Sequence, residues 1–268
     1  MSLPASAAAE IKTCCAALYE TDYARRLLGD SFHPGGLELT ERLGNLLELS
    51  PGQRVLDVAS GTGVSAVFLA ERFGCEVVGL DYSTELVGQS RRRAREAGLE
   101  HLVRFEHGDS ERLPFPDGTF DALICECSFC TFPDKRSAAN EFARVLKPGG
   151  LVGLSDITLN GPLPSELTGL LAQIVCIADA LPLDRYEVLL EEAGFRIDRV
   201  EPHPEVLAST VRDVRARLLG AELILKAKKL ELPGVDLKQA KSVAASAAET
   251  IEEGTLSYGL LVGTLHYG

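Results

Sequence analysis

Five short, almost continuous apolar runs dominate residues 53–156, and each is followed by a polar or helical stretch. In order along the chain they are QRVLDVASGTG, CEVVGLD, VRFEHGD, FDALICEC and GLVGLSD. Uninterrupted apolar runs of this length are typical of strands that are buried on both faces of a sheet. Their alternation with helical stretches indicates βαβ crossovers. The sequence therefore predicts an α/β fold with a mostly parallel, doubly wound sheet.

The flanking segments complete this prediction. We expect an N-terminal helical flap over residues 1–50, a binding core over 51–160, and further helices and the last strands over 161–268, all in a single domain of 268 residues. The C-terminal part includes a helical insertion at 205–254, which either caps the site or forms a homodimer surface. Apolar periodicity and capping signals place the elements outside the five runs. Helices are expected at 7–28, 37–49, 64–72, 85–97, 135–146, 165–178 and 184–193, and strands at 195–201 and 256–265.

Composition narrows the classes of partner and compartment. The formal net charge is −12, which argues against the phosphate backbone of nucleic acid as a partner. No apolar run approaches the ~20 residues of a transmembrane helix, and the N-terminus lacks the layout of a signal peptide. We therefore expect a cytoplasmic protein without a membrane partner. In that reducing compartment its seven cysteines are not expected to form disulfides.

The first apolar run leads into a glycine-bearing turn. Gly61 and Gly63 in VLDVASGTG allow a ligand to approach the backbone at the start of a helix. This turn alone would also suit a nicotinamide dinucleotide enzyme. Three acidic residues, Asp57, Asp81 and Asp109, mark the ends of the first three strands. Because these carboxylates would repel a pyrophosphate, they indicate a nucleoside that carries a positive charge.

Four ordered motifs carry a family resemblance over roughly residues 35–200. VLDVASGTG, VVGLDYS, GDSERLPFPDGTFD and EFARVLKPGG resemble the motifs of class I S-adenosyl-L-methionine (SAM) dependent methyltransferases. LPFPDGTFD and RVLKPGG are most similar to the branch with ubiquinone/menaquinone C-methylases and arsenite methyltransferases. The resemblance implies a Rossmann-like fold, SAM as cofactor, S-adenosyl-L-homocysteine as product and a small-molecule methyl acceptor.

The resemblance also implies a set of cofactor-binding residues. Asp57 and the turn with Gly61 and Gly63 would hold the methionine end of SAM, Asp81 the ribose, and Asp109 the adenine edge. The alanine before the turn stands where the family usually has glycine, and its methyl group is tolerated if φ there is negative. The full expected set is Asp57, Ala59, Ser60, Gly61, Gly63, Asp81, Tyr82, Asp109, Ser110 and Cys125.

The segment CECSFC at 125–130 suggests where the acceptor binds. Cys127 leaves the fourth strand at its carboxyl end, where the SAM methyl group should point. Cys176 follows on a later helix, and either Cys14 or Cys15 faces inward from the N-terminal helix. Arsenite methyltransferases use cysteines at similar places, and thiolates select soft ions. The resemblance thus implies a trivalent metalloid, or another thiol-bound small molecule, as substrate. No resident metal site is expected, because C-x-C-x-x-C lacks a second ligand pair.

Several readings stay open at this point. A metalloid lone pair needs no general base, and His33 and His107 read as hydrogen-bonding residues of a loop and a strand. One alternative is a C-, O- or N-methyltransferase for an apolar metabolite, like the quinone methylases. A second alternative is a thiol-based metalloid-binding or sensor protein without turnover.

Overall fold

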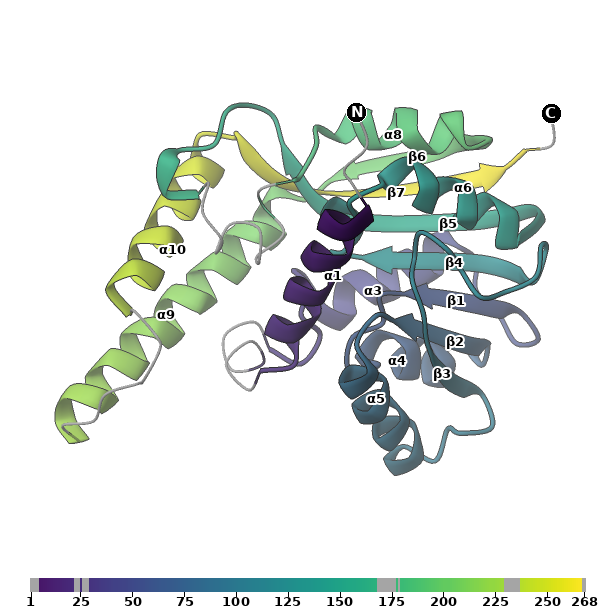
Figure 1. Ribbon diagram of the computed structural model, residues 1–268, viewed down its shortest axis with the longest axis horizontal. Coiled ribbons are helices and arrows are strands. Elements are labelled where there is room, and N and C mark those ends of the chain that lie inside the picture. The colour runs from purple at the N-terminus through teal and green to yellow at the C-terminus, as the bar shows by residue number, and fades with distance from the viewer. Residues whose placement is uncertain are drawn as a thin grey trace.

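A computed structural model describes residues 5–21, 25, 29–167, 177, 179–228 and 237–266. Within these residues the chain forms one seven-stranded sheet with the strand order β3-β2-β1-β4-β5-β7-β6 (Figure 1). Helices flank the sheet, so the predicted Rossmann-like α/β fold is confirmed. The division into a flap, a binding core and a substrate-side part of one domain remains a prediction.

The parallel half of the sheet consists of the apolar runs seen in the sequence. Its strands are β1 (Arg54–Val58), β2 (Glu76–Asp81), β3 (Val103–His107), β4 (Phe120–Glu126) and the start of β5 (Leu146–Leu159). They are joined by α4 (Val64–Phe73), α5 (Thr84–Glu96) and α6 (Lys135–Val145). Since crossovers between parallel strands are right-handed, winding outward from β1 in two directions places these helices on both faces. All five strands then end at the same edge.

The connection from α6 to β5 differs from the prediction. The helix expected at 135–146 is present as α6 and ends one residue early, at Val145. However, β5 already begins at Leu146 and includes KPGG (147–150), ahead of the apolar run that was expected to form the strand. The pairing of β4 with β5 skips from Leu146 to Leu151 at this point. Pro148, which has no N–H group, lies in the skipped stretch and breaks no ladder bond there.

The last strands reverse direction. After α8 (Leu183–Glu192) and β6 (Phe195–Pro202), the chain returns through β7 (Leu256–Leu265), which pairs antiparallel with both β5 and β6. The predicted strands at 195–201 and 256–265 are therefore present. Of the helix expected at 165–178, the structure describes the short 3-10 turn η2 (Ser165–Leu167), and most of the remainder lies outside the described residues.

The N-terminal flap consists of two described helices. α1 (Ala5–Tyr19) lies across the carboxyl ends of the central strands in Figure 1, and α3 (Gly36–Leu46) packs on the sheet. The apolar face of α3 approaches β5 closely, since a Cβ added at Gly153 would lie 2.7 Å from a methyl carbon of Leu43. The first predicted helix, 7–28, is confirmed as far as Tyr19, and most of 22–28 lies outside the described residues.

Two long helices form the C-terminal insertion. α9 (Pro204–Lys228) and α10 (Leu237–Glu252) lie side by side and extend away from the sheet (Figure 1). Whether they cap the site or form a dimer surface remains a prediction. Across the described residues, no helix is both long and apolar enough to cross a membrane.

Candidate functional site

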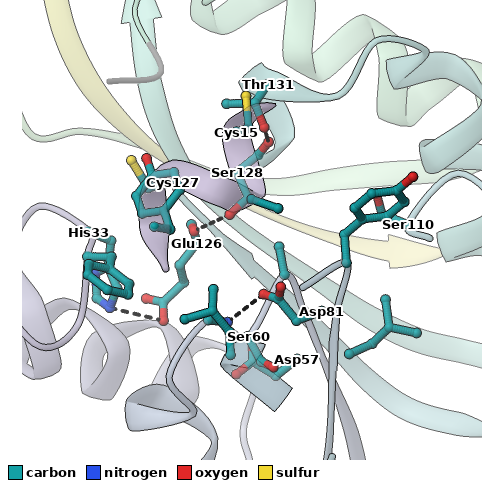
Figure 2. Close-up of a pocket in the computed structure, with 18 of the residues that line it drawn as sticks. Cys15, His33, Asp57, Ser60, Asp81, Ser110, Glu126, Cys127, Ser128 and Thr131 are labelled. Atoms are coloured by element: carbon teal, nitrogen blue, oxygen red, sulfur yellow. Dashed lines mark hydrogen bonds and ion pairs between the residues drawn. The ribbon is translucent and has the colours of Figure 1, made fainter. Parts of the chain in front are cut away.

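A cavity opens at the carboxyl edge of the sheet, where strands, α1 and the segment before α3 meet (Figure 2). The loops after β1, β2 and β3 line its aspartate half. Segments from α1, residues 31–33 and the chain after β4 line its cysteine half. The aspartate half comprises Asp57, Ala59, Ser60, Gly61, Leu80, Asp81, Tyr82, Leu86, Gly108, Asp109 and Ser110. The cysteine half comprises Cys15, Ala16, Tyr19, Ser31, Phe32, His33, Ser65, Glu126, Cys127, Ser128, Thr131 and Phe132, and Lys12 of α1 lines the cavity beside Asp109.

Asp57 is the most deeply buried acid of the aspartate half. It belongs to the end of β1 and is 3% exposed, and its Oδ2 has no hydrogen-bond partner among the described residues. Burial raises the pKa of Asp57 well above its ordinary value, and the negative charges of Glu126 and Asp81 raise it further. The hydroxyl of Ser60 is likewise buried without a partner in the described part of the chain. Since buried polar atoms are normally paired, these two groups fit a polar, cationic ligand.

The turn after β1 is shaped by its glycines. Gly61 and Gly63 both have positive φ, 54° and 76°. A Cβ at Gly63 would lie 2.6 Å from the ring of Phe105, so this position requires glycine for space as well as for conformation. Gly61 lines the cavity, whereas Gly63 lies behind it at the start of α4. The turn thus brings backbone atoms close to any ligand above β1.

The condition stated for the methyl group of Ala59, a negative φ, is not met. Ala59 has φ 59°, in the left-handed region that glycine tolerates and alanine does not. Phe32 and Cys127, which line the same cavity, also have positive φ, 60° and 51°. Strained backbone at non-glycine residues tends to cluster at functional sites. Here the three strained residues are spread over both halves of the cavity.

Asp81 ends β2 and is fixed by the backbone. One carboxylate oxygen accepts from the N–H of Gly61 and the other from the N–H of Ser83, both at 2.8 Å. Burial raises the pKa of Asp81, although these two hydrogen bonds oppose the shift. Each oxygen keeps a further lone pair for a ligand hydroxyl. Tyr82, the next residue, also lines the cavity.

Asp109 has a cationic partner that the sequence did not reveal. The ammonium group of Lys12 on α1 lies 2.8 Å from both oxygens of Asp109 and 2.5 Å from an oxygen of Glu111. Two carboxylates neutralise this one cation, so the cavity keeps its acidic character. Asp109 and Ser110 both line the aspartate half, as predicted for the adenine edge. No local pattern could have paired residues 97 positions apart in the chain.

The structure separates the predicted cysteines. Cys127 and Cys15 line the cysteine half, whereas Cys14 is exposed. Cys125 is fully buried within β4 and does not line the cavity, and burial raises the pKa of its thiol. Cys176 lies outside the described residues. Within the described part of the chain, no three His, Cys, Asp or Glu side chains gather in a way that could hold a metal ion.

A buried acid–imidazole pair lies beside the predicted thiol. Nε2 of His33 is 3.5 Å from Oε2 of Glu126, and each side chain is 4% exposed. Both residues line the cysteine half, and Figure 2 shows the Glu126 side chain turned toward His33. From the sequence, His33 reads as a loop hydrogen-bonder, and Glu126 was passed over. A glutamate inside an otherwise apolar strand end, in ICEC, was the available signal.

Comparison with known proteins decides the family. A family model described as "Methyltransferase domain" matches residues 55–150. "Methyltransferase GfsG" from Streptomyces halstedii is 32% identical over 231 residues, which cover 82% of this chain and 82% of that protein. This chain is a class I SAM-dependent methyltransferase. The nicotinamide alternative is therefore wrong, and the cofactor is SAM.

Two further relatives of this methyltransferase have names that mention an acceptor. "Demethylmenaquinone methyltransferase" from Thermus thermophilus is 48% identical over 105 residues, covering 39% of this chain and 46% of the relative. "Arsenite methyltransferase" from Halobacterium salinarum is 31% identical over 166 residues, covering 59% and 41%. The match spans less than half the length of each of these two relatives.

The fold of the methyltransferase recurs in solved structures. The structure titled "putative sarcosine dimethylglycine methyltransferase from Galdieria sulphuraria" superimposes with a TM-score of 0.80 at 21% identity. The match covers 92% of this chain and 98% of that one. At this identity the similarity establishes the shared fold alone.

Proposed function

We propose that this methyltransferase transfers the methyl group of SAM to an oxygen, nitrogen or carbon nucleophile of a small organic acceptor. The acceptor would lie in the cysteine half of the cavity. The observation that carries the proposal is the combination there of aromatic side chains with a buried acid–imidazole pair. Tyr19 and Phe32 meet edge to face at 5.3 Å, and Phe132 lines the same half. Aromatic walls with a few aimed polar groups are typical of sites for organic ligands.

The same proposal assigns the aspartate half to SAM. Asp57 and Ser60 would bind the ammonium end of the methionine moiety, Asp81 the ribose hydroxyls, and Asp109 and Ser110 the adenine. The unpartnered Oδ2 of Asp57 supports this assignment, because a buried carboxylate without a partner favours a cationic donor. When bound, SAM supplies an activated methyl group on a positively charged sulfur. The carboxylates of Asp57, Asp81 and Glu126 give the cavity a sign of charge that favours such a cation.

The name of one relative also supports an organic acceptor. The demethylmenaquinone methyltransferase of Thermus thermophilus is named for a quinone precursor, and it shares 48% identity over the matched residues. An aromatic ring of that kind would share the cysteine half with Phe32 and Phe132, which both line it. This candidate predicts little loss of activity in a Cys127→Ser variant.

A trivalent metalloid is the second candidate acceptor. It is favoured by a specific observation, because Cys15 and Cys127 both line the cysteine half. In Figure 2 their sulfur atoms lie on the side of Glu126 that faces away from Asp57. Thiolates bind soft ions such as trivalent arsenic, and Cys176 would complete the thiol set in this case. The lone pair of the bound metalloid would then attack the methyl group without a base.

An assay with methyl-labelled SAM tests the two candidates against each other. Hydroquinones and phenols represent the first class, and arsenite with glutathione represents the second. Wild type is compared with Cys127→Ser, Cys15→Ser and Cys176→Ser, with Cys75→Ser as the control, because Cys75 is fully buried away from the cavity. Label on the aromatic acceptors, kept in all the variants, supports the first candidate. Label on arsenic alone, lost in the cavity variants but not in Cys75→Ser, would replace it with the second.

A further inference from the structure

The acid–imidazole pair and the side chains that hold it come from four separate segments of the chain. Glu126 ends β4, and the hydroxyl of Thr40 on α3 lies 3.1 Å from each of its carboxylate oxygens. His33 precedes α3, and its Nε2 lies 3.2 Å from the hydroxyl of Ser65 on α4. Both side chains are almost fully buried and still border the cavity. The pair is therefore preorganised beside the space for the acceptor.

Hydrogen-bond partners assign the tautomer of His33. Its Nδ1 lies 3.2 Å from the carbonyl oxygen of Pro34, which can only accept a hydrogen bond. Nδ1 therefore carries the proton in the neutral ring, and Nε2 presents a lone pair. That lone pair can accept from the hydroxyl of Ser65 at 3.2 Å, and Oε2 of Glu126, which has only lone pairs when ionised, lies 3.5 Å from the same nitrogen. A proton on Nε2 would place a donor opposite Oε2 and turn the contact into a charge-assisted ion pair.

We propose that His33 and Glu126 form the proton-accepting pair of this methyltransferase, and that its acceptor loses a proton on methylation. The inference rests on the proposed function, since it concerns an acceptor in the cysteine half. As the bond from the acceptor atom to the methyl carbon forms, the bond between sulfur and that carbon breaks, and its electron pair stays on sulfur. The proton of the acceptor moves to the pair and rests between Oε2 of Glu126 and Nε2 of His33. The pair changes from a net charge of −1 to 0, and solvent removes the proton after product release.

The surroundings of the pair favour this uptake. Asp57 of β1 faces Glu126 closely enough that the charge of Glu126 raises the pKa of Asp57. Burial raises the pKa of Cys125 on the same strand and of Tyr258 on β7, and the charge of Glu126 also raises both. The charges of Cys127 and Asp156 raise the pKa of Tyr258 as well. Lys12 is the one Lys or Arg side chain among the described residues that line the cavity, and Asp109 and Glu111 already pair with it. An incoming proton therefore reduces the repulsion among the acidic groups around the pair.

Two acceptors of the same shape test the inference. We expect 1-naphthol to need a base at about pH 8, whereas 1-naphthalenethiol is already a thiolate and has no proton to lose. Initial rates are measured with labelled SAM for wild type, Glu126→Gln and His33→Asn. The amide introduced by Glu126→Gln would keep an oxygen for Thr40, and the amide of the second variant can still donate to Pro34. Glu141→Gln is the matched control, because Glu141 pairs with Arg144 on α6 and does not line the cavity.

We expect the variants of the pair to lose activity on 1-naphthol but not on 1-naphthalenethiol. Glu126→Gln should lower the rate on 1-naphthol at least about 100-fold, the usual scale for a lost general base. Its rate on the thiolate should stay within about threefold of wild type. Its affinity for SAM, measured by calorimetry, should fall by no more than a similar factor, since Asp57 and Asp81 keep their carboxylates. His33→Asn should show the same selectivity with a smaller loss. Equal losses on both acceptors, or no loss on either, would overturn the inference while leaving the proposed function intact. Wild type that labels neither acceptor would overturn the proposed function together with the inference.

Discussion

The buried carboxyl group of Asp57 lowers the free energy of unfolding of the apo protein at neutral pH. Its pKa is raised, so the folded protein holds the Asp57 proton more tightly than the unfolded chain does. Stability contributed by this group therefore falls as pH rises from the unfolded value, near 3.8, toward the higher folded value. We expect apo Asp57→Asn to exceed wild type in free energy of unfolding at pH 7 by about 1–3 kcal/mol. The difference should close near pH 4.

Denaturant titrations across this pH range check the prediction, and Asp121→Asn is the control. Partial burial on its own would raise the pKa of Asp121. Hydrogen bonds from Lys147 and from the backbone N–H of Arg54 outweigh this effect, and the pKa is lowered. Its variant should therefore lose stability at neutral pH. Calorimetry should also show that Asp57→Asn binds SAM more weakly. An apo variant less stable than wild type at pH 7 would contradict the account of Asp57.

Ala59 offers a second prediction, because its left-handed backbone favours glycine. Relief of about 1–2 kcal/mol of strain is partly offset by the larger conformational entropy of glycine in the unfolded chain, about 0.4–1 kcal/mol. Ala59→Gly should then stabilise the protein by roughly 0.5–1 kcal/mol. The urea midpoint measures this. Ala143→Gly, inside α6, should instead destabilise by about 1 kcal/mol, and loss of stability in both variants would show that Ala59 is unstrained.

The predicted residues that line the cavity are those read within one motif, and their role in binding SAM remains a prediction. The cavity is lined by Asp57, Ser60, Gly61, Asp81 and Asp109, since each follows directly from a strand end in a parallel sheet. Residues joined across the chain were missed. The pair of His33 and Glu126 is separated by most of the binding core in sequence and needs α3 and α4 as well, and nothing local encodes that meeting. The positive φ of Ala59 could not be predicted either, because the identity of a residue does not fix its backbone angle.

At the scale of elements, α1 is attached to the core by side chains. Lys12 binds Asp109 and Glu111, and Glu20, just after α1, accepts from the hydroxyl of Ser83 at 2.7 Å. Among the residues of α1 whose burial is described, 9–17 and Tyr19, none is fully buried. Helix formation alone is marginal at this length. The position of α1 over the cavity therefore depends on a small number of polar tethers.

Lys12→Gln should loosen α1 without unfolding the core. Loss of charged hydrogen bonds worth about 1–2 kcal/mol would speed amide exchange in α1 by roughly 10-fold. Hydrogen-exchange mass spectrometry on peptides from residues 5–19 measures this effect. Lys147→Gln, which breaks the surface pair with Asp121, is the control and should leave α1 unchanged. Unaltered exchange in Lys12→Gln would mean that α1 is held by packing.

Element boundaries were predictable where apolar runs end in glycine or charge. β7 spans 256–265 as expected, and α4, α5 and α8 deviate by one residue or two at their ends. The end of α6 also lies within one residue of its prediction. The start of β5 was not predictable in this way, because KPGG carries a turn signal and yet lies in the strand. Sheet pairing overrides a local signal when the skipped residues fall in a bulge.

At the scale of the whole molecule, the doubly wound sheet is what assembles the site. Reversal of the winding direction between β1 and β4 leaves a crevice at the carboxyl edge, and the ligands of such folds bind there. The flap covers this crevice with α1 and supplies His33 just before α3. One fold thus joins the aspartate half of the cavity, where we propose that SAM binds, to the cysteine half, where we propose that the acceptor meets His33 and Glu126.

A crystal structure with S-adenosyl-L-homocysteine tests the central claim most directly. The account predicts the ammonium group within hydrogen-bond distance of Oδ2 of Asp57 and the ribose hydroxyls on Asp81. It also predicts that the thioether sulfur faces Glu126 and Cys127. Density for the nucleoside in another cleft, or with its sulfur turned away from the cysteine half, would contradict the account.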